Sequence, residues 1–238
     1  MNRVLNLYRS SVGKKSLMAV TGILLVGFVF GHMAGNLKAF QSWDPAGGTL
    51  HPLDQYGEFL REFGYPILPE YGVLWVARIA LLAAVLVHMF AAYRLWTQSR
   101  AARTRGYRKA ESQVFSYASR TMRWGGVIIF LFVIYHILHF TTGDVHPDFE
   151  YGAVYANLVT GFQSTPVALF YIVAVGALSL HVYHGIWSAF ATLGVQNARV
   201  ERARRPLAAA LAIVLFLGYI SVPVAVLAGR WTSIGLTL

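Results

Sequence analysis

The chain has 238 residues, of which 56% are hydrophobic, and it carries a formal net charge of +10 at pH 7. Its mean hydropathy of +0.52 is too high for an ordinary soluble domain. Cysteine is absent, which excludes disulfides, thiolate-bound zinc, iron–sulfur clusters held by this chain and covalently attached c-type haem. Composition therefore indicates a membrane protein.

Five long apolar segments follow one another along the chain. A helix needs about 20 mainly apolar residues to cross a bilayer. We therefore predict an all-α integral membrane protein whose residues 1–238 form a single transmembrane domain with five transmembrane helices. The predicted spans cover about residues 16–38, 71–96, 122–142, 165–193 and 206–229. Thr165 and Pro166 are expected to provide the N-cap and the first turn of the fourth span.

The charges are distributed unevenly between the loops. Lysine and arginine gather before the first span, after the second and after the fourth, whereas most acidic residues lie in the two remaining loops. The positive-inside rule then places the N-terminus in the cytoplasm and the C-terminus outside. This distribution makes the basic charge a sign of membrane topology, with contact to lipid, and not of nucleic-acid binding.

The loop at 39–70 is the longest connection and carries four prolines. Loops of this length are often functional. We expect it to cap the outer end of the bundle, and we expect His51 and His146, which fall in the outer loops, to be solvated.

Histidines inside the spans are the candidate functional residues, because ionisable groups within a membrane are usually there for function. At about 1.5 Å per residue, His32 and His136 fall in the outer half of the bilayer, and His88 and His181 fall in the inner half. Facing helices of a bundle can hold a cofactor, and two neutral imidazoles can ligate a haem iron from both faces. We therefore predict two bis-histidine haems, held in a four-helix bundle to which a fifth helix is added.

Five further residues are candidates for contacts around these cofactors. His139 and His184 each follow a predicted ligand by three residues, so each could replace its neighbour, although we favour a role beside the haem or its propionates. Arg78 lies within the second span and could meet a haem propionate or a quinone, or extend to the membrane surface. Glu58 and Glu62 are candidates for quinone contact, with simple solvation as the alternative.

Several sequence stretches together are specific for one family. They are Ser10–Lys15 leading into Met18–Gly22, Gly31–Asn36, Tyr135–His136 and His181–Ser188. With these stretches the chain resembles the dihaem cytochrome b (b558-type) membrane-anchor subunit of succinate dehydrogenase and fumarate reductase, over nearly its whole length.

The resemblance implies how the chain works. The family's four haem ligands fall on His32, His88, His136 and His181, which gives two haem b groups. Electrons would pass between an iron–sulfur subunit and a membrane quinone, menaquinone being the expected type, while a flavoprotein subunit holds the succinate site. The complex would lie in the bacterial cytoplasmic membrane and could form a higher oligomer. Some members carry an acidic residue where this chain has Ser179, so a proton path of that kind is not expected here.

Three other classes of protein remain open from the residues alone. One is a membrane cytochrome b of another complex, although no single span here carries two histidines about fourteen residues apart. Another is a membrane di-iron oxygenase, whose histidines cluster in boxes near one face of the membrane. A transporter or scaffold that uses histidines for packing or proton transfer is a third, non-redox interpretation.

Overall fold

The computed structural model describes residues 10–44, 49–102, 113–194 and 197–231, with the backbone alone at 113–121. Regular structure within these ranges is entirely helical. The elements are α2 (Ser11–Asn36), η1 (Leu37–Phe40), α3 (Pro52–Glu62), α4 (Gly72–Ala101), α5 (Gln113–Phe140), α6 (Val154–Gln163), α7 (Thr165–Thr192) and α8 (Ala198–Leu227). Helices α2 (with η1), α4, α5, α7 and α8 are long and apolar enough to cross a membrane. The prediction of an all-α membrane protein with five spans is confirmed.

Side-chain caps fix where several helices begin. Ser10 Oγ accepts a hydrogen bond from the Gly13 backbone N–H at 2.9 Å, which satisfies one of the free donors at the start of α2. Asn197 does the same for α8. The expected cap of α7 was one residue too late, because Ser164 is the N-cap and Thr165 is already helical, with Pro166 in the first turn.

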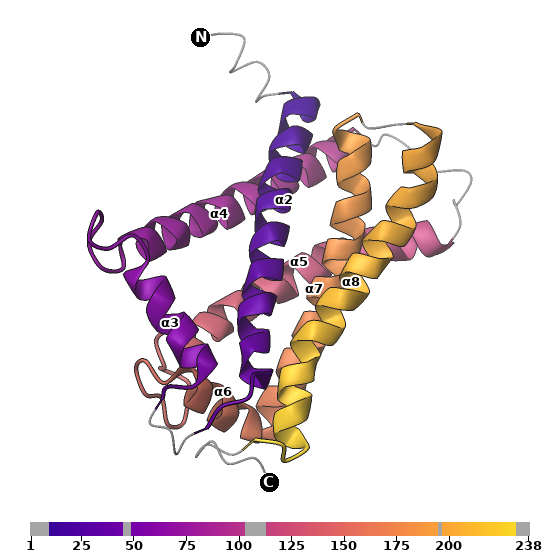
Figure 1. Ribbon diagram of the computed structural model, residues 1–238. Coiled ribbons are helices and arrows are strands. Elements are labelled where there is room, and N and C mark those ends of the chain that lie inside the picture. The colour runs from indigo at the N-terminus through magenta and orange to yellow at the C-terminus, as the bar shows by residue number, and fades with distance from the viewer. Residues whose placement is uncertain (1–9, 45–48, 103–112, 195–196, 232–238) are drawn as a thin grey trace.

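Helix α2 lies at the centre of the bundle and contacts α4, α7 and α8 (Figure 1). Helices α7 and α8 run side by side, and α5 packs on α7. Helix α4 makes its main contacts with α2 and α3. All four helices that carry the candidate histidines therefore gather around α2 and α7.

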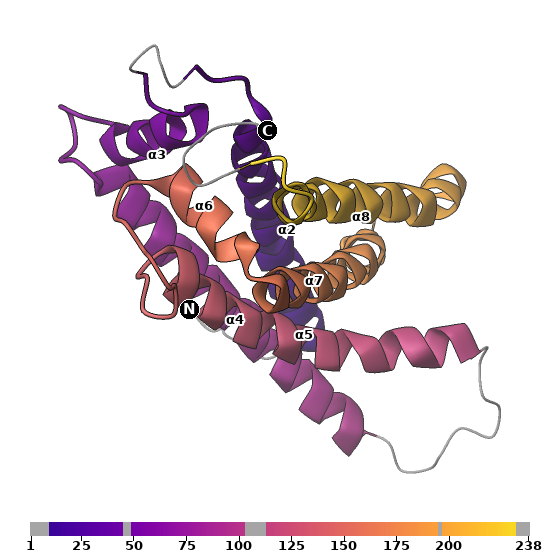
Figure 2. The ribbon, with the colours of Figure 1, turned by 90° about the horizontal axis from the view of Figure 1, so that it is seen from below.

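Helices α3 and α6 cover one end of the bundle, where α2 ends and α7 begins (Figures 1 and 2). We call this the capped end and the opposite one the open end. Asp54 Oδ1 accepts the Tyr155 backbone N–H at 2.8 Å, which joins α3 to the first turn of α6. A cluster of buried apolar side chains lies at the capped end, and includes Leu53, Tyr155 and Trp231. The described part of the loop at 39–70, which contains α3, does cap the bundle, as expected.

His51 was expected to be solvated, and this expectation is wrong. Its side chain is only 4% exposed, and its ring stacks on Tyr155 with the centroids 3.7 Å apart. Its Nδ1 accepts the Leu53 backbone N–H at 3.1 Å, so the imidazole is the N-cap of α3. Burial lowers the pKa of His51 to about 4.

The same correction applies to His146, whose side chain is buried. Its Nε2–H donates to the Asn157 carbonyl at 2.9 Å, and its Nδ1 accepts the Asp148 backbone N–H at 3.2 Å. Both ring nitrogens are thus satisfied by loop and helix backbone, which removes the need for water. Position in a connecting loop misled the prediction, since these loops fold back onto the bundle.

Candidate functional site

The first candidate site is the capped-end pair, His32 on α2 and His136 on α5. Their ring centroids lie 5.8 Å apart, with the ring planes at 83°. Both residues lie in the last third of their helices, close to the end that α3 and α6 cover. The sequence-predicted outer pair is therefore brought together in space.

Aromatic rings surround the capped-end pair. Phe28, one turn before His32 on α2, stacks on its ring at 5.5 Å between centroids. The Tyr219 ring lies 6.2 Å from His32, and its hydroxyl donates to the Val29 carbonyl at 2.8 Å, which ties α8 to α2 beside the site. The rings within about 6 Å of His136 are Phe132, Phe140 and Tyr171. This lining places the two histidines in a largely apolar environment.

The second candidate site is the open-end pair, His88 on α4 and His181 on α7, with ring centroids 6.3 Å apart. The Nδ1 atom of His88 lies 3.1 Å from the Met18 carbonyl and 3.1 Å from Thr21 Oγ1. Thr21 Oγ1 donates to the Leu17 carbonyl at 2.8 Å. The carbonyl can only accept, so His88 donates from Nδ1 and keeps the lone pair of Nε2, as a metal-binding histidine does.

The two pairs lie at different levels of the bundle, and their separation can be estimated from the residues of α2 that each pair contacts or contains. His88 touches α2 at Met18 and Thr21, whereas His32 is on α2 itself, eleven residues beyond Thr21. Eleven residues of α-helix correspond to about 16 Å. Two separate cofactors can therefore be held, one above the other.

The distances in both pairs fit a haem iron between the rings. A metal–imidazole bond is about 2 Å long, so two imidazoles on opposite sides of one metal have centroids about 6 Å apart. Both observed distances, 5.8 Å and 6.3 Å, agree with this value. Beside His181 lies a cavity of about 170 Å³ between α5 and α7, lined by Met122, Trp124, Gly125, Ile128, Ala177, Leu180, His181 and His184. Small residues near the open-end pair keep this space free.

His139 and His184 have different surroundings. His139 is fully buried, and its Nδ1 lies 3.0 Å from the Tyr171 hydroxyl. His184 is half-buried beside the open-end cavity and accepts the Trp187 indole N–H at 3.3 Å. His139 does not lie as close to His32 as His136 does, and His184 does not lie as close to His88 as His181 does. Their roles beside the haem remain predictions.

The three charged candidates do not converge in the structure. Glu58 and Glu62 are exposed on α3, and Arg78 is exposed on α4. The Arg78 guanidinium lies over the Trp75 ring at 5.1 Å, a cation–π contact typical of a side chain at a membrane surface. Their contacts with a propionate or a quinone stay predictions.

Tyr171 is the functional candidate that sequence reasoning missed. Its hydroxyl lies between Nδ1 of His139, at 3.0 Å, and Nδ1 of His136, at 3.5 Å. No motif marks it, but it follows Thr165 by six residues, about 9 Å of helix, which puts it at the level of the capped-end pair. Applying the depth estimate to hydroxyl groups as well as histidines could have found it.

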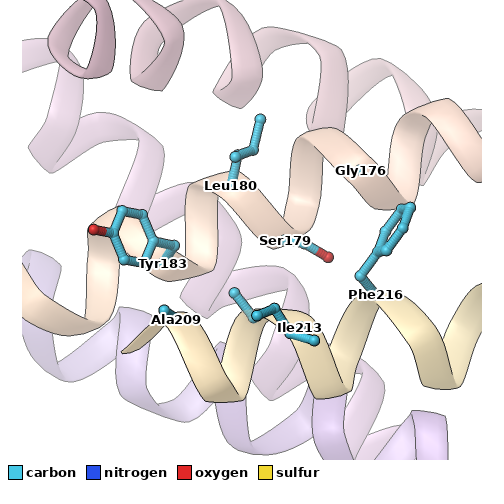
Figure 3. Close-up of a pocket in the computed structure, with 8 residues that line it drawn as sticks. Gly176, Ser179, Leu180, Tyr183, Ala209, Ile213 and Phe216 are labelled. Atoms are coloured by element: carbon cyan, nitrogen blue, oxygen red, sulfur yellow. The ribbon is translucent and has the colours of Figure 1, made fainter. Parts of the chain in front are cut away.

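An apolar groove of about 470 Å³ lies on another face of α7, between α7 and α8 (Figure 3). It is lined by Gly176, Ser179, Leu180, Tyr183, Ala209, Ala212, Ile213 and Phe216. Ser179 Oγ is buried and has no hydrogen-bond partner among the described residues. Such a groove suits an apolar chain, and it holds none of the paired histidines.

Among the described residues, no three histidine, cysteine, aspartate or glutamate side chains come together as a possible metal site. A di-iron centre needs several such ligands in one place. The arrangement in two separate pairs favours haem ligation over the di-iron alternative.

Comparison with known proteins identifies the family. Residues 97–220 match the model of the succinate dehydrogenase/fumarate reductase transmembrane subunit. The match covers more than half of the chain, from the end of α4 to α8, and includes one histidine of each pair, His136 and His181. No curated protein and no solved structure matches the chain. The chain belongs to the family of succinate dehydrogenase/fumarate reductase transmembrane subunits, and it is a multi-pass membrane protein.

Proposed function

We propose that this membrane-anchor subunit holds two b-type haems and carries electrons between an iron–sulfur subunit and a membrane quinone. His32 and His136 would ligate one haem, and His88 and His181 the other. The observation that carries the proposal is the presence of two imidazole pairs, each with centroids about 6 Å apart, on levels about 16 Å apart.

Held by two histidines each, the haems would supply one-electron transfer and not oxygen binding. The chain's own residues would set how each haem is held. Met18 and Thr21 orient His88 from its Nδ1 side, and the aromatic lining places His32 and His136 in a largely apolar environment. The chain has no extramembrane domain in the described ranges that could hold a flavin, so succinate or fumarate would react on a flavoprotein partner.

Orientation follows from charge. The described basic residues at the open end lie in the first turns of α2 and α8 and in the last turns of α4; they are Lys14, Lys15, Arg94, Arg100, Arg199, Arg202, Arg204 and Arg205. The positive-inside rule then puts the open end in the cytoplasm of a bacterial cell and the capped end outside. The open-end pair would receive electrons from the iron–sulfur partner, and the capped-end pair would exchange them with quinone, for which menaquinone is our choice. Glu58, Glu62 and Arg78 are the polar candidates near that end.

Two measurements on the purified complex test the proposal. A reduced-minus-oxidised spectrum should show low-spin b-type bands with two haems for each copy of this chain, and succinate should reduce quinone in membranes. Reduction of a soluble dye by the flavoprotein partner is the control, and should persist when the haem ligands are replaced. Absence of b-type bands from an intact complex would contradict the proposal.

A further inference from the structure

We infer that Tyr171 and His139 are positioning residues for His136, forming a hydrogen-bonded chain that sets which nitrogen of His136 carries its proton. This inference rests on the proposed function, because it assumes that His136 ligates a haem iron. The chain runs from α5 to α7 and back to α5, one helical turn closer to the capped end.

The geometry of the chain is specific. The Tyr171 hydroxyl lies 3.0 Å from Nδ1 of His139 and 3.5 Å from Nδ1 of His136. Tyr171 is 6% exposed and His139 is completely buried, so water does not compete for these bonds. The Tyr135 ring stacks on His139 at 5.4 Å between centroids, which holds the imidazole in place.

A single proton decides the direction of both bonds. Tyr171 has one O–H to donate, and a neutral imidazole has one N–H. If Tyr171 donates to His139, its oxygen is free to accept Nδ1–H of His136, and Nε2 of His136 keeps the lone pair that a metal needs. If Tyr171 donated to His136 instead, Nε2 of His136 would carry the proton and could not ligate. An acceptor at Nδ1 of His139 therefore directs the Tyr171 proton away from His136 and holds His136 in the ligating tautomer.

The surroundings of His139 leave no room for it to ligate a haem itself. Its Nε2 is buried and has no hydrogen-bond partner among the described residues. A Cβ atom at Gly161 would come within 2.8 Å of its Cε1, and the His146 ring lies 4.9 Å away. The free edge of His139 thus faces closely packed α6, where a macrocycle has no room.

The test uses the full complex with three variants of this chain. Tyr171→Phe removes the acceptor for His136 Nδ1–H, which makes the imidazole a weaker donor to iron. We expect both haems to remain and the potential of one component to shift upward, while the other is unchanged. The matched control is Tyr135→Phe, which removes a neighbouring hydroxyl outside the chain and should move neither potential.

His139→Leu should have a more severe effect than Tyr171→Phe, because it should reduce haem content and not only shift a potential. Without its acceptor, Tyr171 can donate to Nδ1 of His136, which favours the tautomer that carries the imidazole's own proton on Nε2. We therefore expect loss of the capped-end haem from a large part of the complexes. The double variant Tyr171→Phe/His139→Leu removes the wrong donor as well and should regain haem relative to His139→Leu. A purely structural defect would give the double variant the lower haem content.

The outcomes separate this inference from the proposed function. A wild-type complex with no b-type haem would overturn the proposed function. Two haems in the wild type, with both potentials unmoved in Tyr171→Phe, or with less haem in the double variant than in His139→Leu, would overturn the positioning role alone.

Discussion

The two histidine pairs are similar in spacing and different in how their surroundings hold them. At the open end, a backbone carbonyl and a threonine orient His88, and a cavity lies beside His181. At the capped end, side chains enclose His32 and His136, and two further side chains continue the hydrogen bonds of His136. A carbonyl cannot be removed by substitution, whereas a tyrosine can. The capped-end pair should therefore be the more sensitive one to mutation.

The largest expected effect comes from removing one histidine of each pair in turn. His136→Ala should abolish the capped-end haem and His88→Ala the open-end haem, so each complex should keep about half of its haem because the sites lie about 16 Å apart. Haem content and a redox titration of each variant measure this. Loss of both haems from a complex that is still assembled would show that the two levels depend on each other.

Acid should loosen the capped end before the rest of the molecule. The folded state holds His51 neutral, with its pKa lowered to about 4 from an ordinary 6.5. The contribution of neutral His51 to the free energy of unfolding of the capped end is then fully present above pH 6.5. It falls as the pH drops towards 4, by an amount on the order of 2 kcal/mol after allowance for solvent screening. Burial raises the pKa of Asp54, which acts in the opposite sense at the lower end of this range.

Hydrogen exchange of α3 and α6 as a function of pH is the measurement for this effect. His51→Asn keeps a helix-capping acceptor without the titration. After correction for the intrinsic pH dependence of amide exchange, the variant should lack the loss of α3 protection that His51 causes between pH 6.5 and 4. Equal pH dependence in the variant would show that another group controls the cap.

A glycine-to-alanine substitution beside each histidine pair tests how tightly its surroundings are packed. A Cβ at Gly161 would come within 2.8 Å of His139 and 3.1 Å of His146, whereas one at Gly22 would lie 3.3 Å from His88. We expect Gly161→Ala to cost about 1–3 kcal/mol and Gly22→Ala less than about 1 kcal/mol. Thermal unfolding of the complex compares them. A larger loss from Gly22→Ala would mean that the open end is the more tightly packed.

The smallest effect should come from Thr21→Val, next to His88. The variant removes one contact of Nδ1, but the Met18 carbonyl still accepts the proton, so both haems should be retained. We expect a loss of about 0.5–1 kcal/mol in stability. Measured haem content below that of the wild type would show that the hydroxyl, and not the carbonyl, orients His88.

Helix number and the pairing of the histidines by depth could be predicted, because bilayer thickness forces regular helices of known rise. His32 lies beside His136 and His88 beside His181, as expected from counting residues along each span. The buried states of His51 and His146 could not be predicted, since both depend on helices α3 and α6 folding over the bundle. Tyr171 was missed because its role depends on the rotation of α7 relative to α5, which the sequence does not encode in any motif.

The positions of iron in the assembled complex test the central claim most directly. An experimental density map by cryo-electron microscopy would locate each haem and its ligands. We expect one iron between the imidazoles of His32 and His136 and a second between those of His88 and His181. A single haem would contradict the two-level arrangement, and an iron ligated by His139 or His184 would contradict the assignment of the four ligands.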